Sequence, residues 1–210
     1  MTINTFDDAE GGLWLSAEHG AKSIWIDIET TALKAKEGYI IEFAALAVDN
    51  KLNVIDSISS IIYPCDDSGL PIEFSKLEDL IDSGGTRAIH ESSGLLADLR
   101  NSNSNIFINT SVLKERFVDF IVANELQGVY MGGASVHFDR YWLIEHIGDE
   151  VIDLLSHRNI DTTSISEYLR YKGIKVPEHP TSEEFGKPHR ALADIYNSLE
   201  YFKLLLNVYI

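Results

Sequence analysis

Residues 23–31 have the sequence SIWIDIETT, and this stretch decides the fold of the chain. An apolar run rich in β-branched residues becomes acidic at its end, which predicts a buried strand that carries two carboxylates to the rim of a sheet. Because side chains alternate along a strand, Asp27 and Glu29 lie on the same face. Two carboxylates at this spacing repel each other unless a divalent cation lies between them, so the spacing alone indicates Mg²⁺ or Mn²⁺.

The segments around this strand predict an α/β fold with a mixed sheet flanked by helices. Strand-like segments at 39–49 and 53–63 are separated by a turn-prone stretch, and with residues 24–28 they make an antiparallel meander. Residues 64–124 are patterned for helices, with polar breaks at 83–85 and 101–105. Short strands at 128–133 and 157–161 each precede a helical pattern, so the second half alternates strand and helix.

The helix starts follow from capping residues. Thr162 or Thr163 is the expected N-cap of the helix after the second short strand, and residues 190–206 form the expected closing amphipathic helix. The proline-containing stretch 175–188 between them is expected to be a loop.

Length and composition predict one domain over residues 21–210, preceded by an irregular extension over residues 1–20. No apolar stretch approaches the roughly 20 residues that span a bilayer, and the N-terminus lacks the basic region of a signal peptide. We therefore expect a cytoplasmic protein without a membrane partner. Cys65 is the only cysteine, which excludes an intrachain disulfide and a thiolate metal cluster.

The charge of the chain restricts its partners. The formal net charge is -16, and no basic tract is present. A protein that holds long nucleic acid through its backbone normally presents a surface rich in Lys and Arg. A nucleic-acid substrate of this chain is therefore expected to be short and held mainly at its end.

Three more residues can complete a site with Asp27 and Glu29. Asp139 lies in the expected first turn of a helix, where an acid is favoured by the helix dipole alone. His189 and Asp194 are five residues apart, about 140° around a helix, so they cannot face one site from the same regular helix. We therefore expect His189, which follows Pro188, at or before the helix start, with Asp194 projecting from the helix.

Together these residues resemble a known family. The pattern Asp-x-Glu, a later Asp in a Ser-x-x-x-Asp helix start, and His-x-x-x-x-Asp in the last helix are similar to the DEDDh subgroup of DnaQ-like 3′-to-5′ exonucleases. Within that superfamily the chain most resembles oligoribonuclease, over about residues 23–205. The segments that carry the likeness are WIDIETTAL (25–33), IIEFA (40–44), HESSGL (90–95), RNID (158–161) and HRALADI (189–195).

The resemblance implies a ribonuclease H-like fold and a role for each matching residue. Two Mg²⁺ or Mn²⁺ ions would be held by four carboxylates, those of Asp27, Glu29, Asp139 and Asp194. His189 would be the general base, and Leu33 would wedge beside the terminal bases. The 5′-phosphate of a very short substrate would be held by His90, Ser135, Arg158 and Thr163, with the Arg and Thr coming from the other subunit of a homodimer.

The function that follows is a metal-dependent 3′-to-5′ exoribonuclease that hydrolyses short RNA oligonucleotides to 5′-mononucleotides. Short single-stranded RNA is favoured over DNA as its partner. The same five residues would also serve a DEDDh exonuclease acting on single-stranded DNA or longer RNA, such as a proofreading-type domain or a phage nuclease. A non-catalytic adaptor with the exonuclease fold is a further alternative, and retention of all five reactive residues argues against it.

Overall fold

A five-stranded mixed sheet with the order β3-β2-β1-β4-β5 forms the centre of the molecule. The computed structural model describes residues 22–66, 68–101, 108–182 and 184–208. Strands β1 (Ser23–Thr30), β2 (Ile40–Val48) and β3 (Val54–Ile61) are antiparallel neighbours. Strands β4 (Tyr130–Gly133) and β5 (Asn159–Asp161) extend the sheet parallel to β1. The predicted meander with added parallel strands is confirmed.

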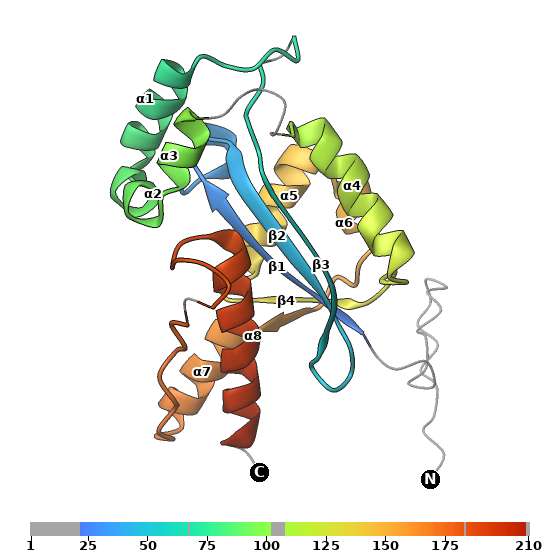
Figure 1. The fold of residues 1–210 in the computed structure, drawn as a ribbon. Helices are drawn as coiled ribbons and strands as arrows, with labels where there is room; N and C mark the ends of the chain where they lie inside the picture. Colours follow the sequence, from blue (N-terminus) through green and yellow to red (C-terminus); the bar gives the residue numbers. More distant parts are fainter. Residues whose placement is uncertain (1–21, 67, 102–107, 183, 209–210) are drawn as a thin grey trace.

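Helices cover both faces of this sheet and one of its ends (Figure 1). Helix α8 with α7 lies on one side, α4 to α6 lie on the other, and α1 to α3 lie at the end where β1 finishes. The bounds are α1 Phe74–Gly84, α2 Arg87–Ser93, α3 Leu95–Arg100, α4 Thr110–Ala123, α5 His137–Ile147, α6 Asp149–Ile152, α7 Thr162–Tyr171 and α8 Ala191–Asn207, with a 3₁₀ turn at Ala35–Glu37.

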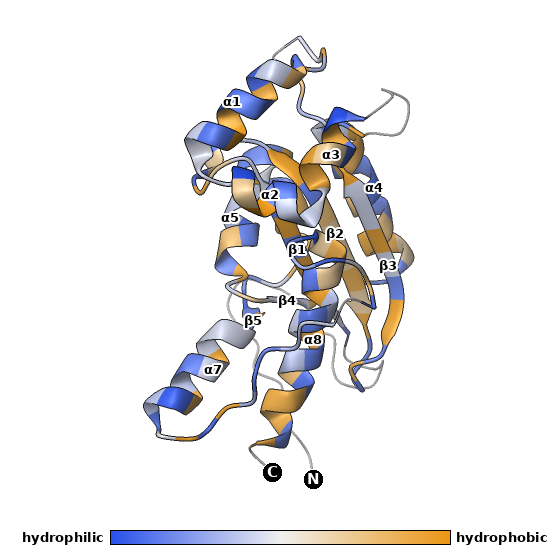
Figure 2. Ribbon diagram, turned by 60° about the vertical axis from the view of Figure 1, so that its left-hand side comes forward, coloured by the Kyte–Doolittle hydropathy of each residue, from blue (hydrophilic) through white to orange (hydrophobic). Residues whose placement is uncertain are grey.

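Alternation along β1 divides the core into two layers. Ile24, Ile26 and Ile28 face a large apolar cluster built with α4 and α5, whereas Trp25 faces the cluster under α8. Strand β2 is buried along its whole length because it lies between these two layers. Figure 2 shows the hydrophobic residues concentrated on the central strands. The side chains of Trp25 and Trp142 are both fully buried.

Two glycines allow backbone to approach the first strand closely. A Cβ on Gly132 of β4 would lie 2.7 Å from the indole ring of Trp25, so the parallel pairing of β1 and β4 requires glycine there. A Cβ on Gly84 would lie 1.9 Å from the carbonyl oxygen of Thr31. The C-terminal end of α1 therefore packs directly on the chain that leaves β1. This is the end of β1 that carries the acidic residues.

Several predicted boundaries change in the structure. The N-cap of α7 is Asp161, and the prediction of Thr162 or Thr163 was wrong. The Asp161 carboxylate accepts hydrogen bonds from the amides of Thr163 and Ser164, whereas the Thr162 hydroxyl donates to the carbonyl oxygen of Gly133. The predicted extension at 1–20 and most of the predicted loop at 101–105 lie outside the described residues. Among the described helices, none is long and apolar enough to cross a membrane.

Candidate active site

Three of the predicted carboxylates converge at the end of β1. One oxygen each from Asp27, Glu29 and Asp194 can be chosen so that all three lie within 4.8 Å of one another. The strand brings the first two to one face, and Asp194 comes from the first turn of α8, which packs on β1 and β2. Residues that are 165 positions apart in the chain thus meet in one cluster.

Asp139 lies next to this cluster, close enough for its charge to act on Asp27. It lies in the first turn of α5 and is 4% exposed. Its Oδ1 accepts a hydrogen bond of 3.1 Å from the backbone N–H of Ile28, the residue between the two acids of β1. The amide is available because β4 pairs with β1 only as far as Trp25. The first turn of α5 is therefore fixed to the acidic end of the strand.

The carboxyl groups hold their protons unusually strongly because they are buried beside one another. Burial, and then the charges of Asp139 and Glu29, raise the pKa of Asp27 well above its ordinary range. Burial, followed by Asp194, raises the pKa of Glu29 from 4.5 to about 8. Burial also raises the pKa of Asp139 and of Asp194. Carboxylate oxygens are the ligands that Mg²⁺ and Mn²⁺ prefer, and a cation would relieve this repulsion, so the donor set fits a divalent metal site.

His189 lies immediately outside the carboxylate cluster, before α8 begins at Ala191. Its backbone N–H is 3.1 Å and 3.3 Å from the two carboxylate oxygens of Asp194, and its Nδ1 is 4.0 Å from Oδ2 of the same residue. Its φ angle is 60°, in the left-handed region. The prediction that His189 precedes the helix start is confirmed. The imidazole is 55% exposed, so water and substrate have access to it.

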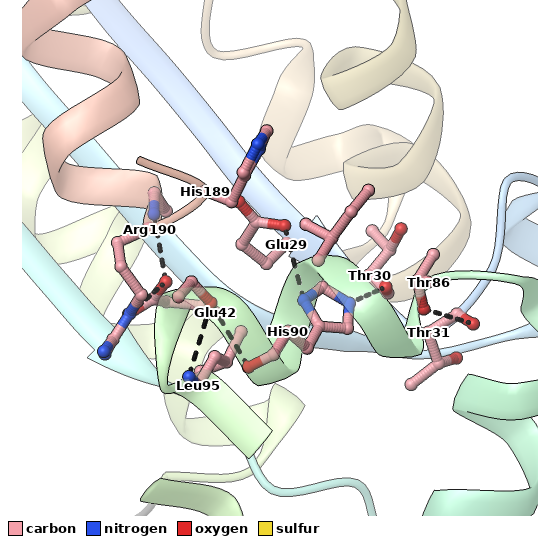
Figure 3. A network of polar contacts seen from close by, with 12 residues as sticks. Glu29, Thr30, Thr31, Glu42, Thr86, His90, Leu95, His189 and Arg190 are labelled. Atoms are coloured by element: carbon pink, nitrogen blue, oxygen red, sulfur yellow. Dashed lines mark hydrogen bonds and ion pairs between the residues drawn. The ribbon is translucent and has the colours of Figure 1, made fainter. Parts of the chain in front are cut away.

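His90 lies beneath the site rather than at its rim (Figure 3). It is 1% exposed, and its Nε2 is 2.8 Å from the carbonyl oxygen of Thr30. Its Nδ1 has no hydrogen-bond partner among the described residues and is 3.8 Å from Oε2 of Glu29. Burial lowers the pKa of this imidazole. In this position, Nδ1 of His90 faces the carboxylate of Glu29. The predicted contact of His90 with a 5′-phosphate stays a prediction.

Two of the other predicted substrate-binding residues meet at the rim formed by β4 and β5. The hydroxyl of Ser135 donates to Oγ1 of Thr163 at 3.2 Å. Ser135 has a φ of 53°, and its amide donates to the carboxylate of Asp161, which also caps α7. Asp161 thus joins the loop after β4 to the start of α7. Arg158 lies exposed just before β5, and Leu33 is 75% exposed on the loop after β1.

Sequence reasoning missed one strong interaction beside the site. The guanidinium of Arg190 donates from Nε and Nη2 to Glu42, at 2.8–3.2 Å, and from Nη1 to Asp98 at 2.8 Å. The Glu42 carboxylate is largely buried and also accepts the Ala191 amide at 2.9 Å. The position of Arg190 next to His189 was the available signal, but its partners lie 148 and 92 residues away in the chain.

Comparisons with known proteins show which family the chain is similar to. A family model described as "Exonuclease" matches residues 24–82. An oligoribonuclease of Rhodococcus jostii is 30% identical over 186 residues, which cover 87% of this chain and 84% of that protein. A probable oligoribonuclease of Dictyostelium discoideum is 28% identical over 189 residues and 89% of both chains.

Solved structures show the same fold. The zinc-bound complex of E. coli exonuclease I with single-stranded DNA matches with a TM-score of 0.57 and 20% identity over 90% of this chain. This chain spans 41% of that protein's length. The sheet and helices described above are thus those of a ribonuclease H-like exonuclease, and this family implies dependence on a divalent metal. The chain belongs to the oligoribonuclease-like family of DEDDh 3′-to-5′ exonucleases.

Proposed function

We propose that this protein hydrolyses short single-stranded RNA from its 3′ end to 5′-mononucleotides, with Mg²⁺ or Mn²⁺ as cofactor. The observation that carries the proposal is the convergence of Asp27, Glu29 and Asp194 within 4.8 Å, with His189 next to them. Each of these residues has an ordinary structural explanation when taken singly. Their meeting in one place, from β1, α8 and the loop before it, has a simple explanation only in shared chemistry.

The carboxylates of Asp27, Glu29, Asp139 and Asp194 would hold two divalent ions. When bound, such ions supply charge stabilisation at the entering and leaving oxygens and make a water molecule more acidic. The protein's own contribution is to fix the ligands: β1 holds two of them at one register, and the Ile28 amide fixes Asp139. A rigid donor set of this kind suits Mg²⁺, which demands nearly octahedral geometry.

His189 would take the proton from the attacking water. Its Nδ1 faces Asp194, which orients the ring and leaves Nε2 as the nitrogen that accepts the proton. The half-exposed side chain has room to rotate into the site when substrate arrives. General-base assistance of this type contributes typically about 10²- to 10⁴-fold in rate.

Substrate length follows from charge and from the rim. A chain with a formal net charge of -16 disfavours extended contact with phosphates. The hydroxyls of Ser135 and Thr163 meet beside Asp161, the N-cap of α7, and two neighbouring hydroxyls can donate hydrogen bonds to a terminal phosphate. We propose that this phosphate end is completed by Arg158 of a second subunit, so that only very short strands fit between the rim and the metal site.

The decisive experiment varies substrate length and sugar. The protein is incubated with Mg²⁺ or Mn²⁺ and 5′-labelled RNA and DNA oligomers of two to about twenty nucleotides, beside the Asp194→Ala variant. Metal-dependent release of mononucleotides from the shortest RNA, absent in the variant, is the expected result. No cleavage of any oligomer would favour the adaptor alternative, and equal cleavage of long strands or DNA would favour a general single-strand exonuclease.

Light scattering tests the proposed dimer. If the protein in solution were a species of 23.5 kDa alone, Arg158 could not act on the site of a second subunit.

A further inference from the structure

The pair formed by Glu42 and Arg190 connects the metal-binding strand to the loop that carries His189. Arg190 follows His189 directly, and two of its guanidinium nitrogens, Nε and Nη2, donate hydrogen bonds to the carboxylate of Glu42. This two-point geometry fixes the direction of the guanidinium plane as well as its distance, which a single contact cannot do. Figure 3 shows Arg190 reaching to Glu42 while His189 points the other way.

Glu42 is itself held in register with the site. It lies directly opposite Glu29 in the antiparallel ladder of β1 and β2, and side chains opposite each other in such a ladder lie on the same face. The Glu42 carboxylate also accepts the backbone N–H of Ala191, the first residue of α8. One carboxylate thus fixes both the guanidinium and the helix start to the same rung of the sheet that presents Glu29.

The backbone of His189 needs such a fixed point. A φ of 60° is unfavourable for a residue with a Cβ, and it persists only where the surroundings hold it. On the N-terminal side, the preceding loop runs back along α8. The ring of Phe185 stacks on Tyr196 at 3.7 Å, and Ser182 exchanges two hydrogen bonds with Asn197. On the C-terminal side, the described contacts that continue to the sheet are those of Arg190 and Ala191 with Glu42.

We propose that Arg190, through Glu42, is a positioning residue that places His189 over the metal-binding carboxylates. This inference rests on the proposed function, because it concerns the same reaction. Arg190 does not touch the reacting atoms, since its nitrogens are engaged by Glu42 and Asp98. Its loss should therefore lower kcat by misplacing the base, while the binding of the substrate's end at the rim is largely retained.

The site offers a direct way to separate this role from general support of the fold. Glu42, Asp98 and Arg190 line a hollow of about 420 Å³ beside the loop. In the Arg190→Ala variant, free guanidinium ion can enter this hollow and pair with Glu42. Arg190→Lys keeps the charge but not the planar fork, so it should restore only part of the activity. Arg87 is the matched control, because it is similarly exposed and pairs with Asp82 and Glu91 on α1 and α2.

The experiment measures kcat and KM on the short RNA that the wild type cleaves, with and without guanidinium at a concentration that leaves the fold intact. We expect Arg190→Ala to lower kcat about a hundredfold, as expected for a misplaced catalytic group. KM should change by less than about threefold. Guanidinium should restore kcat at least about tenfold in Arg190→Ala and not at all in His189→Ala, because in that variant the base itself is missing. Arg87→Ala should behave as wild type with and without guanidinium.

Amide hydrogen exchange supplies a readout that does not depend on activity. In Arg190→Ala, exchange should accelerate in residues 186–193 and not in β1, and guanidinium should slow it again. Two results with an active wild type would overturn the positioning role alone. One is a kcat of Arg190→Ala equal to that of Arg87→Ala, and the other is a loss of kcat that guanidinium does not restore. A wild type without nuclease activity would instead overturn the proposed function, and with it the catalytic part of this inference.

Discussion

Raising the pH of the metal-free protein should destabilise its fold, because the carboxyls of the site keep their protons to unusually high pH. Burial, followed by the charge of Asp194, raises the pKa of Glu29 to about 8, and burial raises the pKa of Asp27 and Asp139. In the unfolded chain such groups ionise near pH 4. Between these values the folded protein binds more protons than the unfolded chain, so the free energy of unfolding falls as the pH rises.

Buried histidines narrow the window in which this fall can be measured. Burial lowers the pKa of His90 and His146, so these groups make the free energy of unfolding rise with pH. Above pH 6.5, where a histidine of the unfolded chain is already half neutral, roughly 0.4 kcal/mol of this rise remains for each histidine. Between pH 6.5 and 8, a carboxyl that stays protonated only in the fold removes about 2 kcal/mol, at about 1.4 kcal/mol per pKa unit. For a chain of this length, about 2 kcal/mol corresponds to a fall in Tm of roughly 4–8 °C. The raised pKa values of Asp27 and Asp139 make the fall larger.

Thermal unfolding in EDTA, followed by circular dichroism from pH 6.5 to 8, tests this magnitude. Glu29→Gln should flatten the slope, because an amide does not titrate. Glu115→Gln on the exposed surface of α4 is the control for removing one charge and should leave the slope unchanged. Excess Mg²⁺ should reverse the trend, since the ion displaces protons and binds more tightly at high pH. A Tm that stays constant or rises with pH in EDTA would refute the reasoning.

Three further predictions concern the reaction. Asp194→Asn should remove one metal-ligand charge and several kcal/mol of transition-state stabilisation, which lowers kcat on the order of a thousandfold. Titration calorimetry should show that this variant binds Mn²⁺ more weakly, and an unchanged Mn²⁺ affinity would contradict a ligand role. His189→Ala should lower kcat about 10²- to 10⁴-fold with Mn²⁺ affinity retained, and steady-state kinetics beside calorimetry check both. Ser135→Ala combined with Thr163→Ala should raise KM about tenfold for 5′-phosphorylated RNA and leave KM for the 5′-hydroxyl substrate unchanged; an equal rise for both would exclude a phosphate contact.

Much of this fold could be predicted because its signals are local. The alternation of SIWIDIET, the turn-prone residues before β3 and the proline-rich loop before His189 each follow from the chain's own periodicity or turn chemistry. The geometric incompatibility of His189 and Asp194 on one helix was also enough to place the histidine outside α8. The predicted N-cap of α7 was wrong because the strand and the cap share a residue. Asp161 is both the last residue of β5 and the N-cap of the helix.

The remaining features depend on contacts that no local pattern encodes. The burial of His90 beneath Glu29 arises because Gly84 and Thr86 pack α1 and α2 against the backbone of Thr31. Glu42 carries no local sequence signal for its partner, and the structure supplies Arg190, the partner that such a buried carboxylate requires. Thr86 and Thr31 are 55 residues apart and Arg190 and Glu42 are 148 residues apart, so only the assembled sheet brings them together.

A metal site of this kind raises the question of how a cation can be tolerated so near it. A mobile Lys or Arg within reach of Asp27 and Glu29 would compete with the divalent ions for the same oxygens. Burial raises the pKa of Glu29, and the guanidinium of Arg190 offsets part of that rise, so its charge is felt at the site. Its donors, however, are engaged by Glu42 and Asp98, which hold it behind the ligands instead of among them. A lysine, with a flexible stem and a point charge, would lack this fixed direction. The bidentate pair therefore allows a positive charge to anchor the base-bearing loop without occupying the position of the metal.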